Sequence, residues 1–268
     1  MKTAPVTVVV PCYRCATTIE RAVVSVAEQM QRPAELVLVD DASADGTLEV
    51  LHALATRHGD WVKVIALPSN RGAASARNAG WDAAAQPLVA FLDSDDAWHP
   101  QKVEIQYTYM RDHPEVALSG HLCRQLPHSA QEPPQWELGP WSAQPVTWAG
   151  LLVRHAFVTP SVMLRRTIPL RFAEGLRHME DHRLWLEITG ARLPAVKLNI
   201  ELAAVYKPVY GASGLSADMW SMEKAELSNY RYFRDQGKIS SLLLLFLQCY
   251  SLAKFARRLV IVRFLNRT

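Results

Sequence analysis

The sequence has few cysteines and little net charge. Its 268 residues include four cysteines and carry a formal charge of +3, and no acidic residue follows Asp235. The low cysteine count excludes a disulfide-rich secreted scaffold, and the lack of a signal-peptide pattern leads us to expect a cytosolic protein. The small net charge gives no indication of nucleic-acid binding. No apolar run reaches the roughly 20 residues that a membrane-spanning helix needs.

Two of the cysteines, Cys12 and Cys15, have the C-x-x-C spacing. This spacing after a first strand is compatible with a thioredoxin-like redox pair, but it also fits two small residues in a tight loop. Because the ligand-facing loops of every doubly wound fold follow strands, the position favours the second interpretation.

The first half of the chain alternates between apolar β-branched runs and helical patterns. We expect helices at residues 17–30, 46–58 and 72–85, and strands at residues 6–10, 35–39, 61–67 and 87–92. The alternation predicts an α/β protein with a mostly parallel, Rossmann-like central sheet flanked by helices. The loops after the four strands should then lie along one edge of the sheet.

The pattern is less regular beyond residue 99. We expect helices at residues 100–111 and 179–191, strands at 161–164 and 196–206, and a long loop at 123–146 that acts as a lid or binding segment. Trp136 and Trp141 argue against disorder in that loop, because large aromatic side chains favour burial.

Three carboxylates, Asp93, Asp95 and Asp96, directly follow the fourth expected strand. Ligands of open α/β sheets bind at such strand ends. Crowded carboxylates repel one another unless a cation compensates them, and their hard oxygen atoms suit Mg²⁺ or Mn²⁺ bound together with a substrate phosphate. One acid could instead cap the helix that begins near Pro100, but capping does not account for all three.

Five motifs together resemble those of family 2 glycosyltransferases with the GT-A fold. In chain order they are Pro11-x-Tyr13, Asp40-Asp41-x-Ser43-x-Asp45-Gly46-Thr47, Asn70-Arg71-Gly72 with Ala76-Arg77-Asn78-x-Gly80, Asp93-x-Asp95-Asp96 and Glu180-Asp181. The resemblance implies a GT-A domain at residues 1–216 and a helical extension at 217–268. Within the domain it implies a nucleotide-sugar-binding half at 1–98 and an acceptor-binding half at 99–216.

The resemblance also implies a nucleotide site. Tyr13 would stack on the nucleobase, and Asp41 would accept a hydrogen bond from a base N–H, which favours uracil-like edges. Pro11 and Ser94 complete the residues expected around the nucleotide-sugar. Asp45 fits better as a structural residue at the start of the following helix.

The diphosphate and the metal have their own candidates. Arg71 and Arg77 suit the diphosphate, because guanidinium groups pair well with phosphate oxygens, although Arg77 could instead pair with an acid of the cluster. By resemblance Asp95 ligates Mn²⁺ or Mg²⁺, and Asp93 contacts the metal or the ribose. Asp96 either supports Asp95 or caps the following helix.

Asp181 is the expected general base by resemblance. It would remove the proton from an acceptor hydroxyl that attacks the anomeric carbon in a single, inverting displacement. The alternative is that Glu180 and Asp181 only stabilise a helix N-terminus. The chain departs from the family pattern farther on, since Tyr210 stands near the position of a family histidine. Lys207, Tyr210 or Ser213 would have to contact the phosphates instead.

Residues 239–268 combine apolar and basic residues. They fit a helix or helix pair in the headgroup region of an anionic membrane, or alternatively a helix packed on the domain with its basic side in water. We therefore expect a cytoplasmic protein, peripheral on the inner face of the membrane.

The sequence thus predicts an inverting, metal-dependent transferase that moves a sugar from a nucleoside-diphosphate sugar, UDP favoured, to a glycan or lipid-linked acceptor. Surface polysaccharide or lipopolysaccharide synthesis in bacteria is the implied setting. A nucleotidyltransferase and a non-catalytic, membrane-docked nucleotide-binding protein are the alternatives. The glycine-free loop after the first strand disfavours the former.

Overall fold

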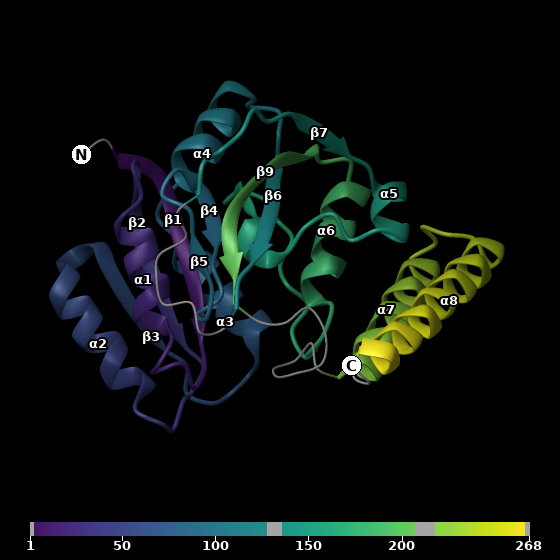
Figure 1. Ribbon diagram of the computed structural model, residues 1–268, viewed down its shortest axis with the longest axis horizontal. Helices are drawn as coiled ribbons and strands as arrows, with labels where there is room; N and C mark the ends of the chain where they lie inside the picture. Colours follow the sequence, from purple (N-terminus) through teal and green to yellow (C-terminus); the bar gives the residue numbers. More distant parts are fainter. Residues whose placement is uncertain (1–2, 128–135, 207–217, 266–268) are drawn as a thin grey trace.

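A nine-stranded sheet organises the computed structural model, which describes residues 3–127, 136–206 and 218–265 (Figure 1). The strand order is β3-β2-β1-β4-β8-β6-β9-β5, and β7 pairs with β9. The central strands carry the core because their apolar residues are buried on both faces; Val8, Val9 and Val10, for example, have no exposed surface.

The first half confirms the predicted alternation. Parallel strands β1 (Thr3–Cys12), β2 (Arg32–Asp40), β3 (Val62–Ala66) and β4 (Leu88–Phe91) alternate with helices α1 (Ile19–Ala27), α2 (Thr47–His58) and α3 (Ala73–Ala83). A short 3₁₀ turn, η1 (Gly59–Trp61), precedes β3. Each expected helix and strand is present, with ends that differ by at most three residues.

The second half adds antiparallel pairs to this parallel unit. Strand β8 (Met163–Arg165), which follows the 3₁₀ turn η2 (Thr159–Ser161), runs antiparallel to β4 and to β6 (Leu118–Gln125). The long strand β9 (Ala195–Val205) is parallel to β6 and antiparallel to β5 (Ala97–Trp98) and β7 (Ala143–Val146). Helices α4 (Lys102–Asp112) and α6 (Glu180–Gly190) lie where the sequence predicts helices.

The loop predicted at residues 123–146 is only partly a loop. Its first residues belong to β6 and its last to β7, and a short helix, α5 (Trp148–Val153), follows directly. Cys123 to Gln125 form a strand because they pair with Ala203 to Val205 of β9. Because β9 lies far away in the sequence, the local pattern gives no sign of this pairing. The polar residues near Cys123 therefore predict a loop instead.

Helix α3 lies unusually close to the sheet. A Cβ added at Gly80 would lie 2.4 Å from Val9 Cγ1 of β1, closer than real atoms approach. Glycine therefore sets the spacing between α3 and β1, and with it the position of Arg77 one turn earlier.

Two C-terminal helices, α7 (Met219–Asp235) and α8 (Ser241–Leu265), lie side by side near α5 and α6 (Figure 1). Buried acids of α7 hold the pair together: Glu223 accepts a hydrogen bond from Ser251, and Glu226 one from Lys254. The expected domain boundary at 216/217, and with it Lys207, Tyr210 and Ser213, lies outside the described residues. Within the described ranges, no helix has both the length and the apolar content to cross a membrane.

Candidate active site

The carboxyl ends of β1, β2 and β4, the start of α3 and the segment before α6 surround a cavity of about 420 Å³, named here the sheet-edge cavity. It is lined by Pro11, Cys12, Tyr13, Asp41, Asn70, Gly72, Ala73, Ala76, Arg77, Asp93, Ser94, Asp95, Leu176, Arg177 and Glu180. The structure thus brings together seven of the predicted site residues, namely Pro11, Tyr13, Asp41, Arg77, Asp93, Ser94 and Asp95. Such a crevice at the strand ends is where open α/β sheets bind ligands.

Arg77 links two acids across this cavity. Its Nη2 atom lies 2.8 Å from Asp93 Oδ1, and its Nη1 atom lies 2.8 Å from Glu180 Oε1. The guanidinium is nearly buried, with 7% of the side chain exposed. Arg77 therefore pairs with the acid cluster, as the sequence left open, and compensates the carboxylates that would otherwise repel one another.

The electrostatics follow from this bridge. Burial disfavours the charged form of Arg77, but Asp93 and Glu180 outweigh it and raise the pKa of the guanidinium, which stays charged. Burial and the neighbouring Asp181 raise the pKa of Glu180, in spite of the contact with Arg77. A raised carboxyl pKa beside a charged partner is common at functional sites.

Asp41 is buried and its carboxylate organises a loop. Oδ1 accepts the backbone N–H of Arg71 at 2.8 Å, and Oδ2 accepts that of Gly72 at 2.7 Å. Asn70 also donates to the Asp41 carbonyl, at 3.1 Å. Because each oxygen keeps a second lone pair, Asp41 can hold this loop and still accept a hydrogen bond from a ligand.

The other predicted residues differ in exposure. Tyr13 is 45% exposed, so one face of its ring is accessible for stacking. Arg71 does not line the cavity; it lies at the rim and pairs with Glu174 at 2.5 Å, both side chains being about half exposed. Arg177 does line it, and sequence reasoning missed it because no motif includes it.

The remaining acids have structural contacts. Asp45 accepts hydrogen bonds from both the backbone and the hydroxyl of Thr47, in keeping with its expected structural role. Asp96 is buried and accepts from the backbone N–H of Tyr206 at 3.4 Å. Arg21 donates to the Asp95 carbonyl at 2.5 Å, which fixes the loop that carries the acids.

Asp181 does not line the sheet-edge cavity. The residue before it, Glu180, does. Thr159 donates its hydroxyl to Asp181 Oδ2 at 2.8 Å, and the backbone N–H of His182 donates to Oδ1 at 2.6 Å. Asp181 is partly exposed, and Thr159, which orients its carboxylate, belongs to the turn η2. These two donors fix the orientation of the Asp181 carboxylate.

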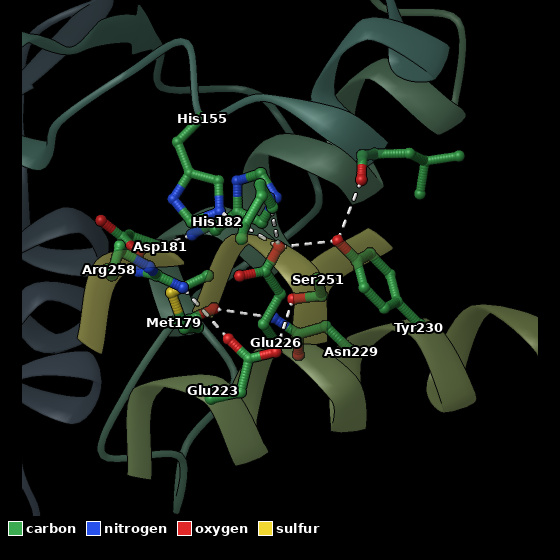
Figure 2. Close-up of polar contacts among 12 residues, drawn as sticks. His155, Met179, Asp181, His182, Glu223, Glu226, Asn229, Tyr230, Ser251 and Arg258 are labelled. Atoms are coloured by element: carbon green, nitrogen blue, oxygen red, sulfur yellow. Dashed lines mark hydrogen bonds and ion pairs between the residues drawn. The ribbon is translucent and has the colours of Figure 1, made fainter. Parts of the chain in front are cut away.

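The turn before α6 is strained and is held by α7. Met179 has a φ of +60°, which is uncommon for a residue with a side chain. The buried Asn229 donates to the Met179 carbonyl at 3.1 Å (Figure 2). Its side-chain oxygen accepts from Arg183 at 2.8 Å. Arg14 and Ala42, in the loops after β1 and β2, also have positive φ. Strain concentrated in loops around one cavity is typical of functional sites.

The chemistry of the donor set fits a divalent cation. The described ranges contain no group of three or more His, Cys, Asp or Glu side chains that could hold a metal. Asp93 and Asp95 nevertheless present two carboxylates to one cavity. Mg²⁺ and Mn²⁺ are commonly held by one or two carboxylates, with substrate phosphates and water completing the shell.

Cys12 and Cys15 are free thiols buried beside the cavity. Burial and the nearby Cys15 raise the pKa of Cys12, whereas a hydrogen bond with Cys12 lowers that of Cys15. The backbone N–H of Cys15 donates to Thr47, so the pair also shapes the tight loop after β1.

Known proteins are similar to this chain in sequence and in fold. The family model of glycosyl transferase family 2 matches residues 7–167. Over 185 residues the chain is 31% identical to UDP-Glc:alpha-D-GlcNAc-diphosphoundecaprenol beta-1,3-glucosyltransferase WfgD of Escherichia coli, which covers 68% of this chain and 69% of that protein. Over 218 residues it is 28% identical to amylovoran biosynthesis glycosyltransferase AmsE of Erwinia amylovora, covering 80% of this chain and 79% of that protein.

The fold agrees with these relatives. Mannosyltransferase PcManGT from Pyrobaculum calidifontis, solved with GDP-Man and Mn²⁺, matches with a TM-score of 0.69 at 18% identity, covering 100% of this chain and 82% of that one. The shared architecture is the GT-A fold. With a matching family model over more than half of its length, the chain belongs to glycosyl transferase family 2 and is a glycosyltransferase of the bacterial polysaccharide biosynthesis type.

Proposed function

We propose that the chain transfers a sugar from a nucleoside-diphosphate sugar, UDP favoured, to a hydroxyl of a glycan or lipid-linked acceptor, with inversion at the anomeric carbon. The setting would be the synthesis of a bacterial surface polysaccharide or lipopolysaccharide. The relative WfgD, whose name specifies UDP-Glc and a diphosphoundecaprenol-linked acceptor, supports this choice of substrates. Family membership favours this activity over the nucleotidyltransferase and the non-catalytic binding protein that the sequence left open.

One observation carries the proposal: the acids after β4 and the start of α6 meet at a single cavity. Asp93 and Asp95 line one wall, and Glu180 lines another, one residue before Asp181. A donor diphosphate beside Asp93 and Asp95 would place its sugar toward α6. Residues 1–98 then supply the nucleotide-sugar-binding half, and residues 99–216 supply the acceptor half.

In the proposed reaction the acceptor oxygen forms a bond to the anomeric carbon while the bond from that carbon to the phosphate oxygen breaks. The electron pair leaves with the nucleoside diphosphate, and Asp181 takes the acceptor's proton. Thr159 and the His182 backbone N–H hold the Asp181 carboxylate in place. General bases contribute roughly 10²- to 10⁴-fold to rate.

The remaining residues of the site would bind the metal, the diphosphate and the nucleobase. When bound by Asp95 and Asp93, Mn²⁺ or Mg²⁺ would supply Lewis-acid stabilisation of the departing diphosphate, and the Mn²⁺ in the PcManGT complex supports such a cofactor. Arg77 pairs with Asp93 and orients its carboxylate. Arg71 and Arg177 offer guanidinium groups at the rim, Tyr13 offers a stacking surface, and Pro11, Asp41 and Ser94 complete the nucleotide pocket.

The outer side of α8 fits a membrane surface. A stripe of apolar side chains at helical spacing is exposed there, namely Leu242, Leu245, Phe246, Leu252, Leu259 and Val260. No acidic residue occurs in residues 239–268, which also carry several Lys and Arg. An apolar stripe flanked by basic residues is the pattern of an interfacial helix on anionic lipid. We therefore place the enzyme at the cytoplasmic face of the membrane, attached through residues 239–268.

The test of the chemistry is Asp181→Asn in the full-length protein. We expect transfer to fall at least 100-fold, in line with loss of a general base, while UDP still raises the thermal midpoint in the presence of Mn²⁺ or Mg²⁺. EDTA should remove that stabilisation. Full transfer activity in D181N, or no response to any nucleoside diphosphate, would refute the assignment.

The test of membrane attachment is L242Q/F246Q, assayed by sedimentation with anionic vesicles. Burying one such side chain contributes about 1.5–3 kcal/mol, and about 1.4 kcal/mol is tenfold in affinity. We expect binding to weaken at least tenfold with no loss of stability, because both side chains are exposed. Met30→Gln, at an exposed apolar residue of another surface, is the matched control. Equal vesicle binding by all three proteins would exclude α8 as the membrane contact.

A further inference from the structure

A second cavity, of about 620 Å³, opens between α8 and the segment that follows α5. It is named here the α8 cavity, and it is lined by Val153, Arg154, His155, Glu226, Tyr250, Lys254, Arg257, Arg258 and Ile261. None of these residues lines the sheet-edge cavity. The proposed reaction chemistry therefore leaves this cavity without a role.

The lining is strongly cationic. Four basic side chains, Arg154, Lys254, Arg257 and Arg258, line the cavity together with a single carboxylate, Glu226. Two of the cations are anchored by buried acids of α7. Lys254 lies 3.2 Å from Glu226. Arg258 lies 3.1 Å from Glu223 (Figure 2). Glu226 also accepts a hydrogen bond from Tyr230 at 2.7 Å. These contacts hold α8 against α7 with its basic residues at the cavity.

The other two cations are not neutralised. Arg154 and Arg257 are exposed, and neither forms an ion pair with any residue in the described ranges. Two uncompensated guanidinium groups in one concave site favour a doubly charged anion. Guanidinium groups bind phosphate oxygens with paired hydrogen bonds, so a phosphate or diphosphate is the matching ligand.

A pair of histidine rings links the α8 cavity to the start of α6. The ring of His155, which lines the cavity, stacks on the ring of His182 with centroids 4.1 Å apart and planes 25° apart. His182 directly follows Asp181 in α6, and its backbone N–H donates to the Asp181 carboxylate; Figure 2 labels the two stacked imidazoles. The His155–His182 stack therefore connects the α8 cavity to the first turn of α6, the helix that carries Asp181.

The cavity also lies beside the proposed membrane contact. Tyr250, Arg257 and Ile261 line it from α8, the same helix that exposes the apolar stripe. With that stripe at the headgroup level, the cavity entrance would lie at the depth of lipid phosphates.

We propose that the α8 cavity binds the phosphate or diphosphate group of a lipid-linked acceptor, with Arg154 and Arg257 as its principal ligands. This inference rests on the proposed function, because it assigns the acceptor's anchor to a site linked through His155 and His182 to the helix of the proposed base. The lipid tail would leave along α8 into the membrane, and the sugar next to the diphosphate would present its hydroxyl to Asp181.

The first test uses inorganic pyrophosphate as the probe, titrated by calorimetry into the full-length protein in EDTA. We expect R154Q/R257Q to bind at least tenfold more weakly than the unaltered protein. The matched control, K224Q/R231Q, removes the same charge from exposed positions of α7 outside the cavity and should bind normally. Unchanged binding by R154Q/R257Q, or equal losses in both variants, would overturn the proposal.

The second test separates an acceptor diphosphate from ordinary phospholipid headgroups. Neutral phosphatidylcholine vesicles carry either farnesyl diphosphate or phosphatidylglycerol at equal surface charge. We expect the unaltered protein to prefer the diphosphate vesicles, and R154Q/R257Q to lose that preference while it still binds phosphatidylglycerol. No preference in the unaltered protein would mean that the cations serve only general membrane attraction, and would overturn the proposal.

A third measurement separates this inference from the proposed function. UDP binding with Mn²⁺ reports on the sheet-edge cavity and should be the same in R154Q/R257Q and in the unaltered protein. Absence of UDP binding in all proteins would refute the proposed function. The pyrophosphate titration and the vesicle comparison do not depend on UDP, so they still decide the role of the α8 cavity.

Discussion

Arg77 and Asp93 form an ion pair of 2.8 Å inside the sheet-edge cavity. The other arm of the same guanidinium contacts Glu180, which lies 103 residues farther along the chain. Arg77 thus ties α3 and the acid loop after β4 to the start of α6. The geometry of the proposed donor and acceptor groups depends on this one cation.

Replacing Arg77 with Gln should destabilise the protein. Removing one partner of a buried pair costs roughly 3–5 kcal/mol, because the remaining charges stay buried without compensation. Chemical denaturation of R77Q measures the change. The control is Arg71→Gln, whose ion pair with Glu174 is about half exposed; such surface pairs contribute only about 0–1 kcal/mol. Similar stabilities of R77Q and R71Q would contradict the role given to Arg77.

Replacing Thr159 with Val tests whether η2 positions Asp181. A hydrogen bond to a charged group contributes about 1.5–3 kcal/mol, so its loss should lower kcat by roughly tenfold or more. The KM for the nucleotide-sugar should not change, because Thr159 does not line the sheet-edge cavity. Thr159→Ser keeps the hydroxyl and should restore kcat. If T159V raises KM and leaves kcat intact, Thr159 does not act through Asp181.

Gly80→Ala tests the close packing of α3 on β1. The added methyl group would lie 2.4 Å from Val9 Cγ1 in the core, and overpacking of this kind costs about 1–3 kcal/mol. A lower thermal midpoint is therefore expected. Gly139→Ala is a matched control, because a Cβ there meets no atom within 4 Å. If both variants melt at the temperature of the unaltered protein, the contact does not set the helix position.

His121 should make the stability sensitive to acid. Burial, with Lys102 and Lys197 nearby, lowers the pKa of His121 to about 3. The unfolded chain binds a proton at this residue below about pH 6.5. Between that value and the folded pKa the unfolded state holds more protons, so stability decreases as the pH falls.

The loss from His121 should be about 2 kcal/mol between pH 7 and pH 5. His121→Gln removes the titrating group, so its stability should vary less with pH over that range. Urea denaturation at several pH values measures the slope for both proteins. The same slope in H121Q and in the unaltered protein would contradict the burial argument.

Much of the fold follows from local patterns. The alternation of apolar runs and helical spacing predicted the parallel half correctly, because β1 with β2 and β2 with β3 are sequential strands joined by one crossover helix. The strands of the second half were predicted less completely. Strand β6 forms through pairing with β9. The position of β9 depends on how the helices and strands between β6 and β9 pack. The sequence of β6 alone contains polar residues that favour a loop.

For the candidate site, the sequence by itself determined which loops meet and which acids they carry, because the strand ends of a parallel sheet share one edge. Only the tertiary structure decided the partners. Glu180 rather than Asp181 enters the cavity wall, Arg77 bridges two acids instead of lying free, and Asn229 of α7 fixes the turn at Met179. Each of these contacts joins residues distant in the chain, and so depends on how helices and sheet pack rather than on any local pattern.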